Sequence, residues 1–410
     1  MARKDRHSVL VAGAGPAGLA AALFLRQRGV DVEVVDERWD APDDDFHVIL
    51  HPDVVERLDD AGARLDLAHA AHPVDTVVVH DGPRRVAALR LRETAVRPGP
   101  AAVLPVRTVR DSLEEALRQR QVRVERHRRL ARVDRTSDRV AVEVDVLDRD
   151  SAGYGVSHME GVVVRTARHA PTYLIAADGR ESVARQQLGV GWRAIGAPMA
   201  TVAFEFASGW SPGPEVHLYV GDAVAALWPA PNRRLRLTLQ LPASTPLLAS
   251  WLDAHHTPDR ADLAMMVDAH LPWVHMPIGT VTWAQVQWTQ LGVAERASVG
   301  AVWLLGEAAH QLSPMASHSL NHGVRMAHDL AATIDEVARD QGAGERLAHQ
   351  AARARAQTLR LAEVGELFHA EPDTDPFIAA NLRRILPMLP VAGLELEAMA
   401  GALRLAPRPL

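Results

Sequence analysis

Three glycines near the N-terminus have the spacing of a phosphate-binding turn. Gly13, Gly15 and Gly18 follow the order G-x-G-x-x-G, with Pro16 and Ala17 inside it. The first glycine permits a tight turn, the second lets the backbone approach a pyrophosphate, and the third lets helix and strand pack closely. This spacing predicts a dinucleotide site at the beginning of a helix.

The residues on either side of the glycines predict the elements that hold them. An apolar run from Val9 to Ala12 predicts a buried strand, and a second run from Val32 to Val35 ends at Asp36. A carboxylate at that point can accept a hydrogen bond from an adenosine ribose hydroxyl. Glu37 and Arg38 follow within reach of the same nucleotide. This order favours a dinucleotide site over an ordinary glycine-rich turn.

Two further acids follow apolar runs far downstream. Asp178 comes after the run from Tyr173 to Ala176 and begins a D-G-x-x-S-x-x-R pattern. Gly306-Glu307 follows the run from Val302 to Leu305. Because ligands of an open α/β sheet bind beyond the carboxyl ends of its strands, both positions are candidates for a ligand site.

The composition excludes several other functions. The chain has no cysteine, which removes disulfides, thiolate catalysis and cysteine-ligated zinc and favours a cytoplasmic location. Its formal net charge of -6 argues against general nucleic-acid binding. No apolar run approaches the ~20 residues that span a bilayer. We therefore expect a monomer or homodimer with a small-molecule substrate and neither nucleic acid nor membrane as a partner.

In order along the chain, the three motifs resemble the fingerprints of the class A flavoprotein monooxygenases, the para-hydroxybenzoate hydroxylase family. In that family the aspartate of the second motif, here Asp178, lies near the pyrophosphate of FAD and the approach of the nicotinamide donor. The acid of the third motif, here Glu307, hydrogen-bonds the ribityl chain of FAD. The resemblance covers about residues 8 to 345 and implies FAD as cofactor and NAD(P)H as electron donor.

The same resemblance implies further contacts with FAD. Pro314 continues the third motif, and Leu320-Asn321 stands where the family's backbone meets the pyrimidine edge of the flavin. Arg110 resembles an arginine that the family's helix directs at the cofactor. The expected FAD-binding residues are Gly13, Gly15, Pro16, Ala17, Gly18, Asp36, Glu37, Arg38, Arg110, Asp178, Gly306, Glu307, Pro314, Leu320 and Asn321.

The resemblance implies an α/β fold in three parts. A Rossmann-like, discontinuous FAD-binding domain comprises residues 1–75, 101–188 and 290–345. An inserted, mostly antiparallel β-sheet domain for the substrate comprises residues 76–100 and 189–289, where strand-length runs alternate with turn residues. A helical C-terminal region comprises residues 346–410 and includes a long helix from about Glu345 to His369.

The loop before the helix that follows the third motif departs from the family pattern. Ala316 and Ser319 occupy positions where the family has glycines, and His318 lies between them. We expect the added Cβ atoms to crowd the flavin ring and His318 to be a catalytic donor to the ring or to a substrate oxygen. His318 and His322 could also bind a metal with Glu307 or His310, but twenty histidines make such spacing common by chance, and no metal is expected.

Two functions are compatible with these motifs. The resemblance implies a monooxygenase of secondary metabolism that hydroxylates a small aromatic or polyketide-like substrate through a C4a-hydroperoxyflavin. The alternative is a flavoprotein-like scaffold, with FAD structural or lost, that binds or cyclises a small molecule without net redox chemistry. Trp228, Tyr219 and His47 are the expected substrate-pocket residues.

Overall fold

A six-stranded sheet forms the nucleotide-binding half of the computed structural model. The model describes residues 8–40, 46–94, 99–136, 139–149, 161–242, 244–245, 248, 251, 256–339 and 343–408. The sheet has the order β18-β19-β12-β1-β2-β8, and all neighbours are parallel except β18 and β19. The strands are β1 (Ser8–Ala12), β2 (Asp31–Val35), β8 (Val124–Glu125), β12 (Tyr173–Ala176), β18 (Ser298–Val299) and β19 (Val302–Leu304).

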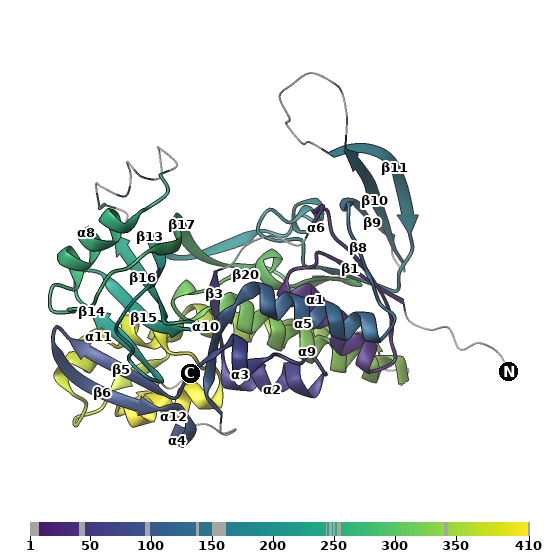
Figure 1. Ribbon diagram of the computed structural model, residues 1–410. Helices are drawn as coiled ribbons and strands as arrows, with labels where there is room; N and C mark the ends of the chain where they lie inside the picture. Colours follow the sequence, from purple (N-terminus) through teal and green to yellow (C-terminus); the bar gives the residue numbers. More distant parts are fainter. Residues whose placement is uncertain are drawn as a thin grey trace.

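The carboxyl ends of three neighbouring strands of this sheet lie in register. Ala12 of β1 pairs with Ala176 of β12, which pairs with Leu304 of β19. The chain therefore leaves all three strands at one edge, as ligand sites of open α/β sheets require. Below the sheet lie α1 (Pro16–Gln27), α5 (Val106–Gln119) and α9 (His318–Arg339) (Figure 1). α1 is buried at every position from Gly18 to Leu25, because α5 and α9 also pack against it.

A second, eight-stranded sheet forms the other half, with the order β20-β17-β13-β16-β15-β14-β5-β6. Only β14 and β5 pair in parallel, so the sheet is mostly antiparallel, as expected. One face packs on α8 (Arg260–His270) and the other on the C-terminal region. The strands are β5 (Thr76–Asp81), β6 (Arg84–Arg90), β13 (Trp192–Ala207), β14 (Glu215–Val220), β15 (Val224–Ala230), β16 (Arg234–Pro242), β17 (Val281–Ala294) and β20 (His310–Gln311).

Smaller elements join the two halves. One of them is a three-stranded sheet of β3 (His47–Leu50), β7 (Ala101–Pro105) and β4 (His72–Val74). Along the chain, α2 (Pro52–Asp60) follows β3, and α5 follows β7. A separate sheet of β9, β10 and β11 projects from the nucleotide-binding half (Figure 1). The remaining bounds here are α3 (Leu67–Ala70), α4 (Leu91–Thr94), α6 (Val183–Gln187), β9 (Arg128–Thr136), β10 (Arg139–Arg149) and β11 (Gly161–His169).

The C-terminal region is helical but contains a strand pair that we did not expect. The long helix, α10 (Ala343–Ala362), ends seven residues before the expected His369. It ends where Gly365 passes the backbone of α11, so closely that an added Cβ would lie 2.8 Å from the Cα of Arg383. The other elements are α11 (Pro376–Ile385), α12 (Leu394–Ala402), β21 (Phe368–Ala370) and β22 (Leu405–Pro407). Within the described ranges, no helix has the length and apolar character needed to cross a membrane.

Candidate functional site

The three sequence motifs meet at the beginning of α1. A Cβ atom on Gly13 would overlap the carbonyl oxygen of Ala177, so the first motif touches the second. The Cβ of Ala17 lies 3.0 Å from the positions that Cβ atoms would take on Gly306 and Gly323. The first motif therefore also touches the third motif and α9. One continuous site thus contains segments that lie far apart in the sequence.

Gly15 differs from the other two glycines in what surrounds it. A Cβ on Gly18 would overlap the carbonyl oxygen of Gly13, and Gly13 itself has a φ of +107°, so both are required by packing or conformation. A Cβ on Gly15 would meet no atom of the described chain within 4 Å. This space lies directly before the first turn of α1, where free backbone N–H groups and the helix dipole favour a phosphate.

Asp36 lies beside this space and already holds the turn. Its carboxylate accepts hydrogen bonds from the backbone N–H of Ala14 at 2.6 Å and from that of Arg38 at 3.0 Å. The side chains of Glu37 and Arg38 are exposed. Pro16 occupies the first turn of α1, where its missing N–H costs no helical hydrogen bond. These residues fit the adenosine half of a dinucleotide.

Two acids extend the site beyond the turn. Asp178 accepts a hydrogen bond from the N–H of Ala184 at 3.2 Å, while its other carboxylate oxygen is buried and has no partner among the described residues. Burial raises the pKa of Asp178. Glu307 is exposed and makes no hydrogen bond or ion pair within the described ranges, so its carboxylate can accept a ligand hydroxyl. Arg110 of α5 is buried.

The N-terminus of α9 offers donors at the other end of the site. The backbone N–H groups of Ser319 and Leu320 donate to no acceptor in the described part of the chain. A helix of 22 residues begins here, at His318. Its partial positive charge and these two donors fit an electron-rich carbonyl edge such as that of a flavin pyrimidine. The residues present therefore fit FAD at both of its ends.

The side chains that replace the family's glycines are accommodated by the protein. The methyl group of Ala316 is fully buried in the core between the second sheet and the C-terminal region. The hydroxyl of Ser319 accepts a hydrogen bond from the N–H of Leu312 at 2.8 Å. We expected both side chains to crowd a flavin ring, and their surroundings do not support that expectation.

This loop is also hydrogen-bonded to β3. The amide of Asn321 donates to the carbonyl of Ile49 at 2.7 Å and accepts from the N–H of His51 at 2.8 Å. Ser317, which has a φ of +53°, accepts from the N–H of Ile49 at 3.1 Å. On the other side, the indole N–H of Trp228 donates to the carbonyl of Met315 at 3.1 Å. The loop is thus held between β3 and the second sheet.

A chain of hydrogen bonds connects this loop to α2 and α9. Asp53 binds the guanidinium of Arg325 through both oxygens, at 2.5 and 2.8 Å. Arg325 also donates to Nδ1 of His51 at 2.9 Å, and Nε2 of His51 lies 2.9 Å from the carbonyl of Ala316. Because a guanidinium only donates, Nδ1 must accept, and the proton of neutral His51 must be on Nε2. Burial and the neighbouring Arg325 lower the pKa of His51 well below its usual value.

His318 does not lie at the open mouth of the helix, where we expected it, and neither of its buried ring nitrogens has a hydrogen-bond partner among the described residues. It is buried against the carbonyls of Pro387 and Leu389, with its ring edge-on to that of His51 at 5.0 Å. Burial lowers its pKa to about 4, so it is neutral at pH 7. The metal alternative is also unsupported, because His322 pairs with the hydroxyl of Thr358 at 2.7 Å. No group of three or more metal-binding side chains occurs among the described residues.

His47 belongs to a buried charged cluster and not to an open substrate pocket. Its backbone N–H and its Nδ1 each lie 2.6 Å from the carboxylate of Glu205, which also accepts from Arg236 at 2.6 Å. Burial would raise the pKa of Glu205, but the hydrogen bonds from His47 and the charge of Arg236 lower it. The guanidinium of Arg236 lies over the ring of Trp283, 5.1 Å from its centre. The cluster connects β3 to β13 and β16.

Trp228 and Tyr219 lie on opposite faces of the second sheet, so they cannot line one pocket. Trp228 is fully buried in the core against the C-terminal region, whereas Tyr219 packs in the core on the α8 side. Tyr219 also stacks on His80 at 4.7 Å. The alternation of side chains along β15 explains this. Tyr219 pairs with Ala225 and shares its face, whereas Trp228 lies an odd number of residues from Ala225 and therefore points to the other face.

The sequence contained a signal for one of the clusters that we did not predict. Glu205 stands between Phe204 and Phe206 in an apolar strand, and a charge there must be paired if it is buried. Its partner Arg236 alternates with the leucines of β16. Nothing in the sequence connects Asp53 with Arg325, because their contact depends on how α2 packs on α9.

Comparison with known proteins gives one family and several relatives. Residues 6–363 match the family described as the FAD binding domain. The dialkyldecalin synthase of Streptomyces rugosporus is 28% identical over 394 residues, which cover 88% of this chain and 75% of the relative. The 6-methylpretetramide 4-monooxygenase of Streptomyces rimosus is 26% identical, over 84% of this chain and 58% of the relative.

Solved structures share the fold. The p-nitrophenol 4-monooxygenase of Pseudomonas putida superposes with a TM-score of 0.73 at 20% identity, covering 97% of this chain and 96% of that protein. The two chains therefore have almost the same length and arrangement of elements.

Proposed function

We propose that this chain, which belongs to the FAD binding domain family, is an FAD-dependent monooxygenase that hydroxylates a small, oxygen-bearing aromatic or polyketide-like substrate. The observation that carries the proposal is the meeting of all three motifs at the beginning of α1. It supports one site that contains an open phosphate cradle, two acids and the N-terminus of α9.

Several expectations from the sequence are confirmed. The family match confirms the resemblance and FAD as the cofactor. The structural match confirms the α/β fold with an inserted antiparallel sheet. The monooxygenases among the relatives agree with an FAD-dependent oxidoreductase that takes its electrons from NAD(P)H.

Each part of the site has a task in this proposal. The space at Gly15 would hold the pyrophosphate, Asp36 the adenosine ribose, and Glu307 the ribityl hydroxyls. The N–H groups of Ser319 and Leu320 would orient the pyrimidine edge and stabilise negative charge there. When bound, FAD would supply the exchange of electrons with NAD(P)H and O2 that hydroxylation needs. The protein supplies orientation and exclusion of water.

We propose that the substrate lies against the face of the second sheet that carries Arg236 and Thr238. The Nε of Arg236 and the hydroxyl of Thr238 are buried without a partner among the described residues. They lie two residues apart on β16 and therefore on one face. A phenol or ketone oxygen would satisfy both groups, and the ring of Trp283 beside Arg236 favours an aromatic neighbour.

The domain limits and the molecular setting stay proposals. The division into residues 1–75, 101–188 and 290–345, residues 76–100 and 189–289, and residues 346–410 is supported by β5 and β6 lying in the same sheet as β13 to β17. We further propose a monomer or homodimer. We also propose a location in the cytoplasm, which the absence of cysteine supports.

The absorption spectrum of the purified protein tests the proposed function. Flavin bands at close to one FAD per chain should bleach when NAD(P)H is added under nitrogen and return when air is admitted. A protein that binds FAD but is never reduced by NADH or NADPH, with or without candidate phenols, is not a monooxygenase.

One observation favours a second function, cyclisation without net redox chemistry. The loop at Ala316 is already held by hydrogen bonds with His51, Ile49 and Trp228, so it keeps its shape without a reactive flavin ring. A dialkyldecalin synthase is also among the relatives. In that case FAD would be structural, and the spectrum described above would show bound flavin that NAD(P)H does not bleach.

A further inference from the structure

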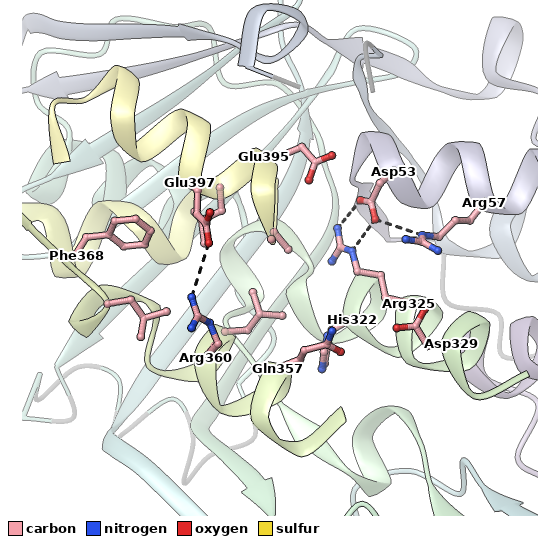
Figure 2. A pocket seen from close by; sticks show the side chains of 15 residues that line it. Asp53, Arg57, His322, Arg325, Asp329, Gln357, Arg360, Phe368, Glu395 and Glu397 are labelled. Carbon is pink, nitrogen blue, oxygen red and sulfur yellow. Dashed lines mark hydrogen bonds and ion pairs between the residues drawn. The ribbon is translucent and has the colours of Figure 1, made fainter. Parts of the chain in front are cut away.

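A cavity of about 230 Å³ lies behind α9, between α2, α10 and α12. Figure 2 shows its lining side chains, which come from the nucleotide-binding half on one side and from the C-terminal region on the other. No residue of the three FAD motifs lines it. It is therefore separate from the proposed cofactor site.

The cavity has an apolar wall and a charged wall. Leu361, Leu367, Phe368 and Leu396 form the apolar wall. The charged wall consists of three arginines and four acids, which are Arg57, Arg325, Arg360, Asp53, Asp329, Glu395 and Glu397. In Figure 2, Arg360 and Glu397 lie on the same side as Phe368, whereas Asp53, Arg57, Arg325 and Asp329 lie across the cavity. A ligand that fits must combine an apolar body with polar groups at one end.

Most of the charges on this wall are already paired. Arg325 binds Asp53, and Arg57 lies 3.5 Å from the same carboxylate. Glu397 lies 3.8 Å from Arg360, and Asp329 lies 3.3 Å from Arg353, just outside the cavity. These pairs fix the wall and leave few groups free for a ligand.

Two hydrogen-bonding groups of the wall remain without a partner among the described residues, and they belong to side chains of opposite charge. The terminal nitrogen NH1 of Arg325 is buried and has no hydrogen-bond partner in the described structure, because its other nitrogens are used by Asp53 and His51. Glu395, in the first turn of α12, makes no hydrogen bond or ion pair with any described residue. In Figure 2 the guanidinium of Arg325 and the carboxylate of Glu395 both border the central space. A buried donor without an acceptor is costly, which makes this nitrogen a point of attachment for an oxygen ligand.

We infer that the cavity binds a zwitterion with an apolar body, that is, an apolar α-amino acid or a compound that keeps its amino and carboxylate groups. Its carboxylate would accept from NH1 of Arg325, and its ammonium group would donate to Glu395. An anion alone would leave Glu395 without a donor, and a cation alone would leave NH1 of Arg325 without an acceptor. The site is thus complementary to a ligand that carries both charges and is neutral overall.

Titration calorimetry on the FAD-loaded protein with three probes of one skeleton tests this inference. The probes are L-phenylalanine, 3-phenylpropanoate, which lacks the ammonium group, and 2-phenylethylamine, which lacks the carboxylate. We expect phenylalanine to bind at least about tenfold more tightly than either of the others, because each loses one charge-assisted hydrogen bond. Equal affinity for phenylalanine and either relative would overturn the inference, as would no binding of any probe at millimolar concentration.

The variant Glu395→Gln shows whether the preference arises at this wall. Glu395 has no partner among the described residues, so we expect the substitution to leave the fold intact. We expect the preference for phenylalanine over 3-phenylpropanoate to fall to within about twofold. The matched control is Glu397→Gln on the same helix, whose partner is Arg360, and it should keep the full preference. A preference that survives in Glu395→Gln would place the binding elsewhere. None of these results depends on whether the enzyme is a monooxygenase.

Discussion

The two ends of the proposed FAD site are built in different ways. At the nucleotide end, Asp36 accepts a hydrogen bond from Ala14, only 22 residues away. The three glycines there lie close together in the sequence, between Gly13 and Gly18. At the loop end, the hydrogen bonds that connect His51 and Ile49 with Ala316 and Asn321 join positions 265 to 272 residues apart in the sequence. The nucleotide end is therefore a local structure with an open space, whereas the loop end forms only when distant segments, including Trp228 of the second sheet, are assembled around it.

This difference indicates how each end should respond to change. A substitution at the nucleotide end that keeps the backbone conformation should affect binding and leave stability unchanged. A substitution or a pH change at the loop end should first affect the stability of the whole chain, because its groups are buried and many of them are paired with distant segments.

The largest expected effect is loss of FAD binding in Gly15→Val. The side chain would enter space that no atom of the described residues occupies, so it should block the pyrophosphate and leave the fold intact. Flavin content after reconstitution should fall below detection, with a melting temperature equal to that of the FAD-free wild type. Gly18→Val is the contrasting variant, because its Cβ would overlap the backbone at Gly13 and should prevent folding. Full flavin occupancy in Gly15→Val would show that FAD does not bind here.

The next largest effect should come from Glu205→Gln at the loop end. Removing this charge leaves Arg236 buried without its partner, which typically costs about 3–5 kcal/mol. Urea unfolding of the FAD-free protein measures the loss. The control is Glu215→Gln, whose pair with Arg85 is partly exposed and should contribute no more than about 1 kcal/mol. If both variants lose equally little, the buried cluster does not hold the two halves together.

Acid should destabilise the loop end. His310 and His318 are buried there, and burial lowers the pKa of each to about 4. An unfolded histidine titrates near 6.5, so below that pH the unfolded chain binds more protons than the folded one. The stability that these two residues contribute is therefore complete above pH 6.5 and is lost as the pH falls. From pH 7 to pH 5 the loss should be about 2 kcal/mol for each residue.

Urea unfolding at the two pH values checks this expectation. His318→Gln should reduce the pH-dependent loss only by the share of His318, about 2 kcal/mol, because His51 and His322 are also buried with lowered pKa. It also lowers stability at pH 7. His69→Gln is the control, because His69 is exposed and close to Asp66, and it should leave the pH dependence as in the wild type. A wild-type stability that is the same at pH 5 and pH 7 would mean that the buried histidines are hydrated.

The same contrast explains what could be predicted from the sequence. The nucleotide end was predicted in detail because each residue there acts through its own backbone and its near neighbours, as Gly13 and Gly18 do. The second sheet was predicted as a type of structure, since alternation identifies strands. The register between paired strands decides which side chains share a face, and it depends on tertiary packing. For this reason Tyr219 and Trp228 were wrongly placed in one pocket. The relation of Arg325 to His51 and the burial of His318 also depend on packing and have no local signal.

The smallest expected effect concerns the loop side chains that replace glycines. From the sequence alone, Ala316→Gly with Ser319→Gly should relieve crowding and tighten FAD binding. In the structure, the methyl of Ala316 lies in the core, and the hydroxyl of Ser319 accepts from the N–H of Leu312. We therefore expect the double variant to change stability more than FAD affinity. The double variant should lose about 1–2 kcal/mol of stability, from added backbone freedom and one lost hydrogen bond, and its FAD affinity should stay within about threefold of wild type. Fluorescence titration with FAD measures the second quantity. Binding that tightens tenfold or more would mean that the loop rearranges when FAD enters and that the two side chains then restrict the ring.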